Sequence, residues 1–226
     1  TAHIAEIRKI LDNIPLENKN SFDKRIVDDL YQMFLLTEKS KPKGQLKIPS
    51  DKKILLVASG SSVNDNLALI KDKSASDNYV IVALNHKPQF SCDHYFFSNQ
   101  QRFDEFTDEL PLKKQIITTN IRSEVLTGVV IPLQDIAYVE KNFVTNVAIL
   151  VINYLILNNT KKVEIAGLDG YQIGKGNYAY DETNMASNEN LFEELNKIVG
   201  GSLLKLKNSI NIELITPSIY ADIFGK

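Results

Sequence analysis

Short apolar runs alternate with amphipathic segments from about residue 53 to the end of the chain. Each run has the length of a buried strand and is followed by turn-forming or polar residues. The predicted strands lie at residues 54–58, 79–85, 94–99, 115–119, 128–133, 163–169 and 212–217, and the predicted helices at 63–72, 145–159 and 189–199. We expect Thr145, a good N-cap residue, to begin the second of these helices. Apolar strands that alternate with helices favour a mainly parallel, Rossmann-like α/β sheet with helices on both faces.

A different pattern precedes this region. Apolar residues recur at helical spacing over 4–14 and again over 22–36, where Ser21 is the expected N-cap. Two helices of this size bury little surface by themselves, so we expect them to pack on another part of the protein. Lysines interleaved with Pro42 and Pro49 follow, and this composition is typical of a solvated linker. The predicted organisation is a helical appendage at 1–40, a linker at 41–51 and an α/β domain at 52–226.

The charges of the chain nearly cancel, with 26 Lys and Arg against 28 Asp and Glu. This balance gives no basic footprint for a nucleic acid and no polybasic face for a membrane surface. No apolar run is long enough to span a bilayer, and the first residues lack the apolar core of a signal peptide. The single cysteine, Cys92, cannot form an internal disulfide, and we expect it to be buried. No Cys and His residues have zinc-site spacing, so we expect a soluble cytoplasmic protein without a metal or another cofactor.

Polar residues gather just past several predicted strands. Ser59 to Ser62 follow the first strand, Asn85 the second, Asn99 the third, and Asp169 the late strand at 163–169. In a parallel sheet these ends share one edge, which is where ligands of α/β proteins bind. A serine-glycine loop between a strand and a helix can direct N–H groups and hydroxyls at a phosphate. Neither a dinucleotide fingerprint nor a P-loop is present, so the loop alone does not define the ligand.

The segment from Val163 to Tyr180 is the most informative stretch of the chain. A strand ends in a Gly-Leu-Asp-Gly turn, and a loop with Tyr171, Tyr178 and Tyr180 follows. Tyrosines offer stacking faces and hydroxyls, which suit a sugar or a nucleotide. The alternative is a strand, a tight turn and a solvated aromatic loop without a ligand. For Asp169 we favour a structural or ligand-orienting role over that of a general base.

The order of motifs from about Lys53 onward resembles that of bacterial CMP-sialic-acid-dependent sialyltransferases that act on lipooligosaccharide. The segment 145–181 is the most similar part, with a helix leading into a strand that ends in an acid and a tyrosine. The resemblance implies that two tyrosines contact the phosphate of a sugar nucleotide, and that two asparagines and a Thr-Asn pair contact the cytidine nucleotide. The substrate-binding residues that follow from the strand ends and this resemblance are Ser59, Gly60, Ser61, Ser62, Asn85, Asn99, Thr145, Asn146, Asp169, Tyr171 and Tyr178.

The chain departs from that family at the catalytic base. The resemblance implies a histidine after the tyrosine loop, but no histidine occurs after His94. Asp181 or Glu182 could act as a base only in a different site design. His86 and His94 could each serve as an acid or a base, although a lone histidine is more often a satisfied polar residue. The sequence therefore favours binding of a nucleotide or nucleotide-sugar over sialyl transfer, and leaves the catalytic residues unassigned.

A second, weaker resemblance covers the first forty residues. They are similar to the C-terminal helices of HMG-CoA-lyase-like 4-hydroxy-2-oxovalerate aldolases from surface-polysaccharide gene clusters. This resemblance implies that the chain is the C-terminal part of an aldolase, and that the aldolase domain is a covalently attached partner. Two alternatives to a glycosyltransferase-like domain stay open. One is a non-catalytic module that senses or channels a ligand for the aldolase, and the other is an interaction domain that forms a homo-oligomer.

Overall fold

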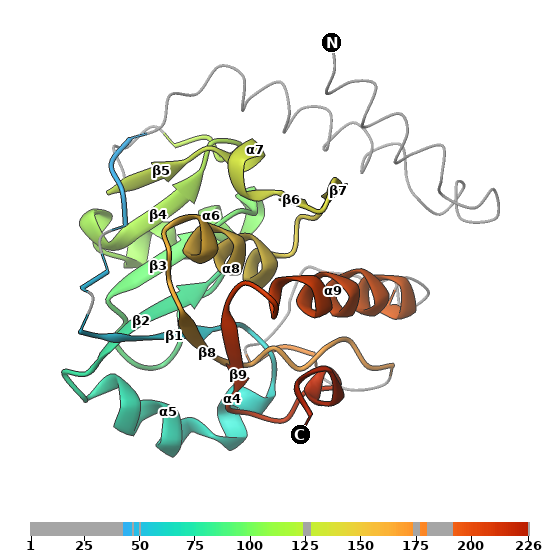
Figure 1. Cartoon of the computed structure of the whole chain (residues 1–226). Coiled ribbons are helices and arrows are strands. Elements are labelled where there is room, and N and C mark those ends of the chain that lie inside the picture. The colour runs from blue at the N-terminus through green and yellow to red at the C-terminus, as the bar shows by residue number, and fades with distance from the viewer. Residues whose placement is uncertain are drawn as a thin grey trace, which may run out of the picture.

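The structure is a computed structural model, and it describes residues 43–46, 48–49, 51–123, 128–173, 177–179 and 192–225. The predicted helical appendage lies outside these residues. In the described part of the chain, seven strands form one parallel sheet in the order β5-β4-β3-β2-β1-β8-β9 (Figure 1). The strands are β1 (Lys53–Val57), β2 (Tyr79–Leu84), β3 (His94–Phe97), β4 (Gln115–Thr118), β5 (Val129–Ile131), β8 (Lys162–Ala166) and β9 (Asn211–Leu214). The prediction of a parallel α/β sheet is confirmed.

Helices cover both faces of this sheet. They are α4 (Ser62–Asp65), α5 (Leu67–Ser74), α6 (Gln100–Phe106), α7 (Leu133–Ile136), α8 (Val147–Leu157) and α9 (Phe192–Leu206). Short 3₁₀ turns are η1 (Thr107–Glu109), η2 (Leu112–Lys114) and η4 (Ala221–Phe224), and β6 (Tyr138–Val139) pairs with β7 (Asn142–Phe143) in a small hairpin. The sequence pattern missed α6, α7 and this hairpin, because none of them carries a periodic apolar stripe long enough to recognise.

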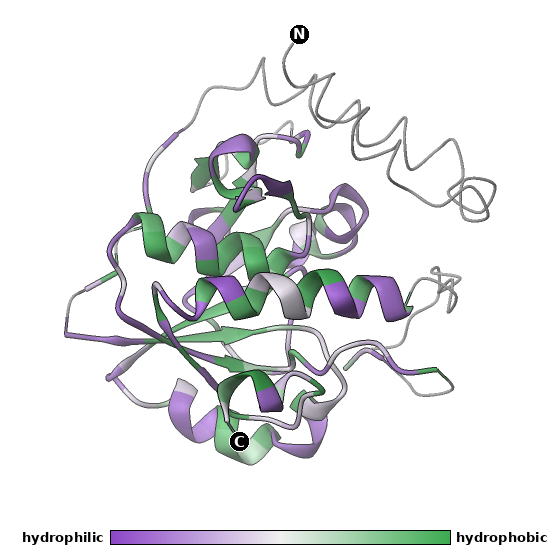
Figure 2. Ribbon diagram, turned by 45° about the vertical axis from the view of Figure 1, so that its right-hand side comes forward, coloured by the Kyte–Doolittle hydropathy of each residue, from purple (hydrophilic) through white to green (hydrophobic). Residues whose placement is uncertain are grey.

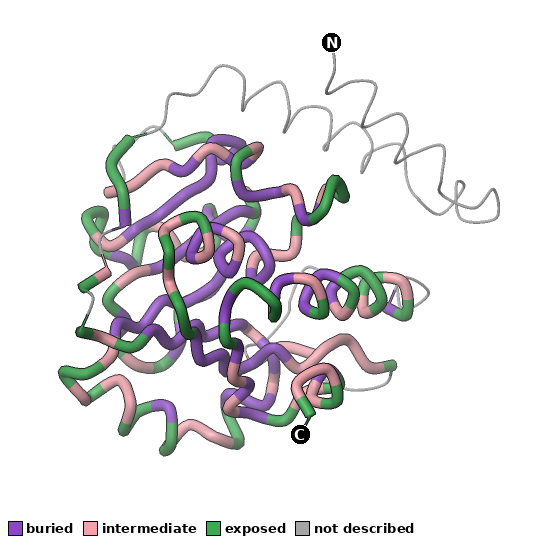
Figure 3. Tube along the Cα trace, viewed as in Figure 1, coloured by how far each residue is buried: buried purple, intermediate pink, exposed green. Residues whose placement is uncertain are grey.

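Alternate residues of each strand face opposite layers of core. In β1, Leu56 packs in the layer under α8 and α9, whereas Leu55 and Val57 pack in the layer under α4, α5 and α6. Figure 3 shows most of the sheet as buried, and Figure 2 shows the hydrophobic residues of α9 interleaved with polar ones, whereas α8 is hydrophobic except for Asn153 and Tyr154. Because both faces are covered, the strands are mostly apolar instead of alternating, with buried polar exceptions such as Gln115 of β4 and Glu164 of β8. Cys92 is buried, as predicted.

The chain reverses its direction of growth across the sheet at β1. From β1 it adds β2, β3, β4 and β5 on one side, and it then returns to add β8 and β9 on the other side. The register places Val57 level with Ala166, so that β1 and β8 end side by side. Parallel α/β sheets bind ligands in the crevice at such a switch point, outside the carboxyl ends of the strands.

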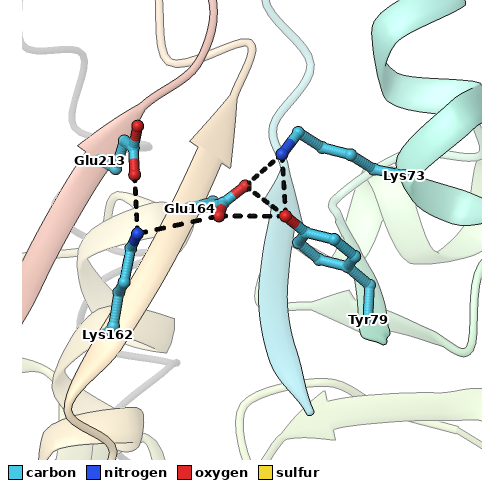
Figure 4. Close-up of polar contacts among 5 residues, drawn as sticks. All are labelled: Lys73, Tyr79, Lys162, Glu164 and Glu213. Carbon is cyan, nitrogen blue, oxygen red and sulfur yellow. Dashed lines mark hydrogen bonds and ion pairs between the residues drawn. The ribbon is translucent and has the colours of Figure 1, made fainter. Parts of the chain in front are cut away.

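A network of charged side chains closes the amino edge of the sheet (Figure 4). Glu164 in β8 is buried, and its carboxylate lies 2.7 Å from the Lys73 ammonium group and accepts a 3.1 Å hydrogen bond from the Tyr79 hydroxyl. Lys73 also donates to Tyr79, and Lys162 pairs with Glu213 at 2.8 Å. Burial opposes the charge of Lys73, but its hydrogen bonds to Glu164 and Tyr79 raise its pKa above the ordinary value of 10.5. Through Lys73, the network links α5 to β2 and β8.

Part of the predicted linker packs on the domain instead of being solvated. Lys43 forms an antiparallel bridge with Val130 of β5, and Leu46 is buried. The Leu46 N–H donates to the Tyr154 hydroxyl of α8. This segment packs on the domain because the apolar Leu46 side chain is buried in the core layer under α8.

Candidate functional site

The loops that follow β1 and β8 meet at the switch point. The Gly60 N–H donates to the Gly167 carbonyl at 2.9 Å, just beyond the last ladder pair of β1 and β8, Val57 with Ala166. A Cβ added at either glycine would lie 2.3 Å from a backbone carbonyl oxygen, that of Gly167 for residue 60 and that of Ala58 for residue 167. Gly167 also has a φ of +72°, which side-chain-bearing residues rarely adopt. Both glycines are therefore required for the close approach of the two loops.

Asp169 joins these loops through its carboxylate. It accepts hydrogen bonds from the Ser62 N–H at 2.8 Å and from the Ser62 hydroxyl at 2.5 Å, and the Ser61 hydroxyl lies 3.5 Å away. Thr216, in the loop after β9, accepts from the Gly167 N–H and lies 2.9 Å from the Ser62 hydroxyl oxygen. We call Ser62, Asp169 and Thr216 the loop junction. The Ser62 N–H and hydroxyl, which we expected to face a phosphate, thus bond Asp169 within the protein.

A cleft of about 380 Å³ opens beside the loop junction. Its described lining residues are Ser61, Ser62, Asp65, Asp169, Gly170, Gln172, Asn177, Pro217, Ser218 and Ile219. The volume falls within the range of small-molecule sites. None of these residues is a lysine or an arginine, so the charged groups of the described lining are two carboxylates. A larger hollow of about 530 Å³ lies beside the start of β9, at the amino edge, where sheets of this kind do not bind ligands.

The two strand-end asparagines do not line the cleft. Asn85 has a φ of +57°, and its side-chain oxygen accepts from the Ser98 N–H at 2.9 Å. Asn99 is the N-cap of α6, where its side-chain oxygen accepts from the Arg102 N–H at 3.0 Å. Both amides therefore stabilise a turn or a helix end, which is a common use of asparagine.

Thr145 and Asn146 also lie apart from the cleft lining. The N-cap of α8 is Asn146, whose side-chain oxygen accepts from the N–H groups of Ala148 and Ile149 at 3.0 and 3.3 Å. The prediction that Thr145 caps this helix is wrong by one residue. Asparagine caps at least as well as threonine, so the sequence alone does not choose between adjacent candidates.

The two described tyrosines of the loop after β8, Tyr171 and Tyr178, each pack against another element. The Tyr171 ring stacks on Phe192 of α9 with ring centres 5.2 Å apart, and the Asn196 side chain bonds both backbone groups of Tyr171. The guanidinium carbon of Arg102 lies over the Tyr178 ring, 5.6 Å from the ring centre. Neither tyrosine is among the cleft-lining residues. The candidates Tyr180, Asp181 and Glu182 lie outside the described residues.

The tyrosine loop is fastened to the first loop by hydrogen bonds. The Ala179 N–H donates to the Ser59 carbonyl at 2.7 Å, and the Asn64 side chain donates to the Ala179 carbonyl at 3.0 Å. Asn177 bonds both backbone groups of Gln172, which shapes the start of the loop. The structure thus brings Ser61, Ser62 and Asp169 together, with Ser59 and Gly60 acting through their backbones.

Sequence reasoning missed Asp65 and Gln172 as cleft-lining residues. The sequence pattern predicts one helix at 63–72 that includes Asp65, but Asn66 breaks that helix into α4 and α5, and Asp65 is the last residue of α4. Gln172 follows Tyr171 and belongs to no motif. Their only available signal is their nearness to Ser62 and Asp169 in the chain.

Of the two histidines in the domain, His86 is held neutral. Complete burial lowers its pKa to about 4, with the nearby Arg102 charge lowering it further and a contact of Nδ1 with the Leu84 carbonyl opposing the change. Burial also lowers the pKa of His94, which lies at the start of β3 on the amino edge of the sheet. At neutral pH His86 is therefore an uncharged imidazole, which cannot supply a positive charge to a ligand.

We expect this neutral histidine to make the fold sensitive to acid. An unfolded chain protonates His86 near pH 6.5, whereas the folded protein does so only near pH 4. The stability that depends on neutral His86 is complete above about pH 6.5 and decreases as the pH falls toward 4, by on the order of 3 kcal/mol. Urea unfolding at pH 7 and pH 4.5 measures the loss, which should be smaller for His86→Gln than for the wild type. An equal loss in both proteins would contradict the assignment.

Comparisons with known proteins assign no family to the chain. No protein-family model matches it, and no curated protein matches it. A solved structure described as "Crystal Structure of a Mammalian Sialyltransferase" is similar over 84% of this chain and 78% of that chain, with 11% sequence identity and a TM-score of 0.47. A similarity this distant carries no function from that protein to this one. None of the described helices combines the length and the apolar character needed to cross a membrane.

Proposed function

We propose that the α/β domain binds a nucleotide or a nucleotide-sugar in the cleft between the ends of β1 and β8. The observation that carries this proposal is the position of the cleft, at the switch point of a parallel sheet. Its polar lining is a second support, because serine, asparagine, glutamine and aspartate side chains bind the hydroxyl groups of sugars and ribose. The resemblance of the sequence to CMP-sialic-acid-dependent sialyltransferases makes a cytidine nucleotide the first candidate.

On the basis of the two sequence resemblances, we place this binding in surface-polysaccharide synthesis and propose that the α/β domain is the C-terminal domain of an aldolase. Glycosyl transfer would need a general base near the acceptor hydroxyl. The titratable groups of the described cleft lining are Asp65 and Asp169, and the chain has no histidine after His94. This observation favours, as a second candidate, a module that binds the ligand for the aldolase without turning it over.

Filling the cleft should abolish binding without unfolding the protein. Ile219 lines the cleft and is 44% exposed, so Ile219→Trp should place an indole ring in the cleft and weaken nucleotide binding at least tenfold. Leu204→Trp on α9 is the matched control, because Leu204 is exposed but outside the lining. Calorimetry with CMP, CDP, UMP, GDP and CMP-sialic acid, in the presence of EDTA, measures the effect. Equal affinities of both variants and the wild type would rule out this cleft as the binding site.

A further inference from the structure

Two hydrogen-bonding side chains of the cleft have no partner among the residues that the structure describes. Across the residues that the structure describes, no hydrogen bond or ion pair involves the Asp65 carboxylate or the side-chain amide of Gln172. The strand-end asparagines differ in this respect, because the side-chain oxygens of Asn85 and Asn99 accept hydrogen bonds from backbone N–H groups. Asp65 and Gln172 therefore present an acceptor and an amide that a ligand can use.

The charge of the described lining disfavours a phosphate at this position. Asp65 and Asp169 both line the cleft, and no lysine or arginine among the described lining residues offsets them. The donors nearest to Asp169, the N–H and hydroxyl of Ser62, already bond its carboxylate. An incoming phosphate would meet like charge, and the Ser62 donors would not be free to bind it. A hydroxyl group, in contrast, can donate to a carboxylate and accept from an amide.

The cleft also has an apolar side. Pro217 and the partly exposed Ile219 line it, together with Gly170, whose missing side chain leaves room for Ile219. A sugar ring matches both sides of the cleft, because its hydroxyls form hydrogen bonds while its C–H face contacts apolar atoms. We infer that the cleft binds the vicinal hydroxyls of a sugar ring through Asp65 and Gln172, and that the phosphate of the ligand lies outside it.

This inference rests on the proposed function for the identity of the ligand, and the ring has two sources. It is either the ribose of the nucleotide or the sugar that the nucleotide carries. The test uses the whole chain in EDTA and compares CMP with 2′-deoxyCMP, and UDP with UDP-glucose, by calorimetry. The variants are Asp65→Ala and Gln172→Ala, and Asp72→Ala is the control because Asp72 is exposed on α5 outside the cleft.

If ribose occupies the cleft, CMP should bind about tenfold more tightly than 2′-deoxyCMP, and Asp65→Ala should remove most of that difference. If the transferred sugar occupies the cleft, UDP-glucose should bind about tenfold more tightly than UDP, and Asp65→Ala should remove most of that difference. Gln172→Ala should act in the same direction as Asp65→Ala, and Asp72→Ala should leave all affinities unchanged.

The inference is overturned if a nucleotide binds and neither Asp65→Ala nor Gln172→Ala changes any affinity, although Ile219→Trp does. The proposed function would survive that result. D-Ribose and methyl α-D-glucopyranoside, titrated alone and followed by NMR, give the converse test. Binding of either sugar that Asp65→Ala abolishes, in a chain that binds no nucleotide, would support the hydroxyl site and refute nucleotide binding. Absence of binding by every probe would refute both.

Discussion

Gly167→Ala is expected to destabilise the domain by about 3 kcal/mol and to abolish ligand binding in the cleft. The new methyl group would lie 2.3 Å from the Ala58 carbonyl oxygen and 2.6 Å from a Val63 methyl group, and neither the strand end nor the buried valine can move freely. The φ of +72° adds strain that does not depend on neighbours. Relief of the clash must separate the loops after β1 and β8, which removes Asp169 from Ser62.

Gly201→Ala provides the matched control for this prediction. Gly201 lies within α9, and nothing would lie within 4 Å of a Cβ added there. Alanine is a better helix former than glycine, so this variant should be more stable than the wild type by up to about 1 kcal/mol. Urea unfolding of the three proteins measures the two changes. A Gly167→Ala protein with wild-type stability would contradict the tight loop contact at the switch point.

Glu164→Gln should lower the free energy of unfolding by about 2 kcal/mol. Its carboxylate is 6% exposed and faces Lys73, so an amide in its place leaves the ammonium group without its counter-charge. Because the pKa of Lys73 is raised, its contribution is complete at neutral pH and is lost only as the pH rises through the raised value. The difference between wild type and variant should therefore persist from pH 7 to about pH 10 and shrink above it.

The control for this variant is Glu213→Gln, which removes the same charge from the same network. The Glu213 side chain is 39% exposed and pairs with Lys162, which is 45% exposed. A solvated pair of this kind contributes less than about 1 kcal/mol. Guanidinium chloride would screen the charges, so urea is the denaturant of choice. Equal losses for the two variants would contradict the role of burial in the Glu164 contacts.

The fold class followed from the sequence because it depends on local pattern. Strands buried on both faces are mostly apolar, with Glu164 of β8 an exception, and β1 and β8 each lead into a turn that contains glycine. The position of β8 beside β1 could not be predicted in this way. It depends on pairing between residues more than a hundred positions apart, such as Val57 with Ala166.

The candidate site was predictable only where chemistry and chain direction agree. Ser61, Ser62 and Asp169 follow adjacent strands, and they do meet. Asn85 and Asn99 also follow strands, but the sequence does not reveal whether an asparagine amide faces a ligand or a nearby backbone group. Asp65 and Gln172 carry no motif, and only the path of the loops after β1 and β8 places them in one cleft.

Calorimetric titration of CMP into the wild-type chain, with thermal unfolding in parallel, tests the central claim most directly. A ligand that binds only the native state must raise the melting temperature as its concentration exceeds the dissociation constant. We expect saturable binding with one site per chain, a selective rise with cytidine nucleotides, and loss of both effects in Ile219→Trp. No heat of binding and no rise with any nucleotide at millimolar concentration would contradict nucleotide binding at the switch point.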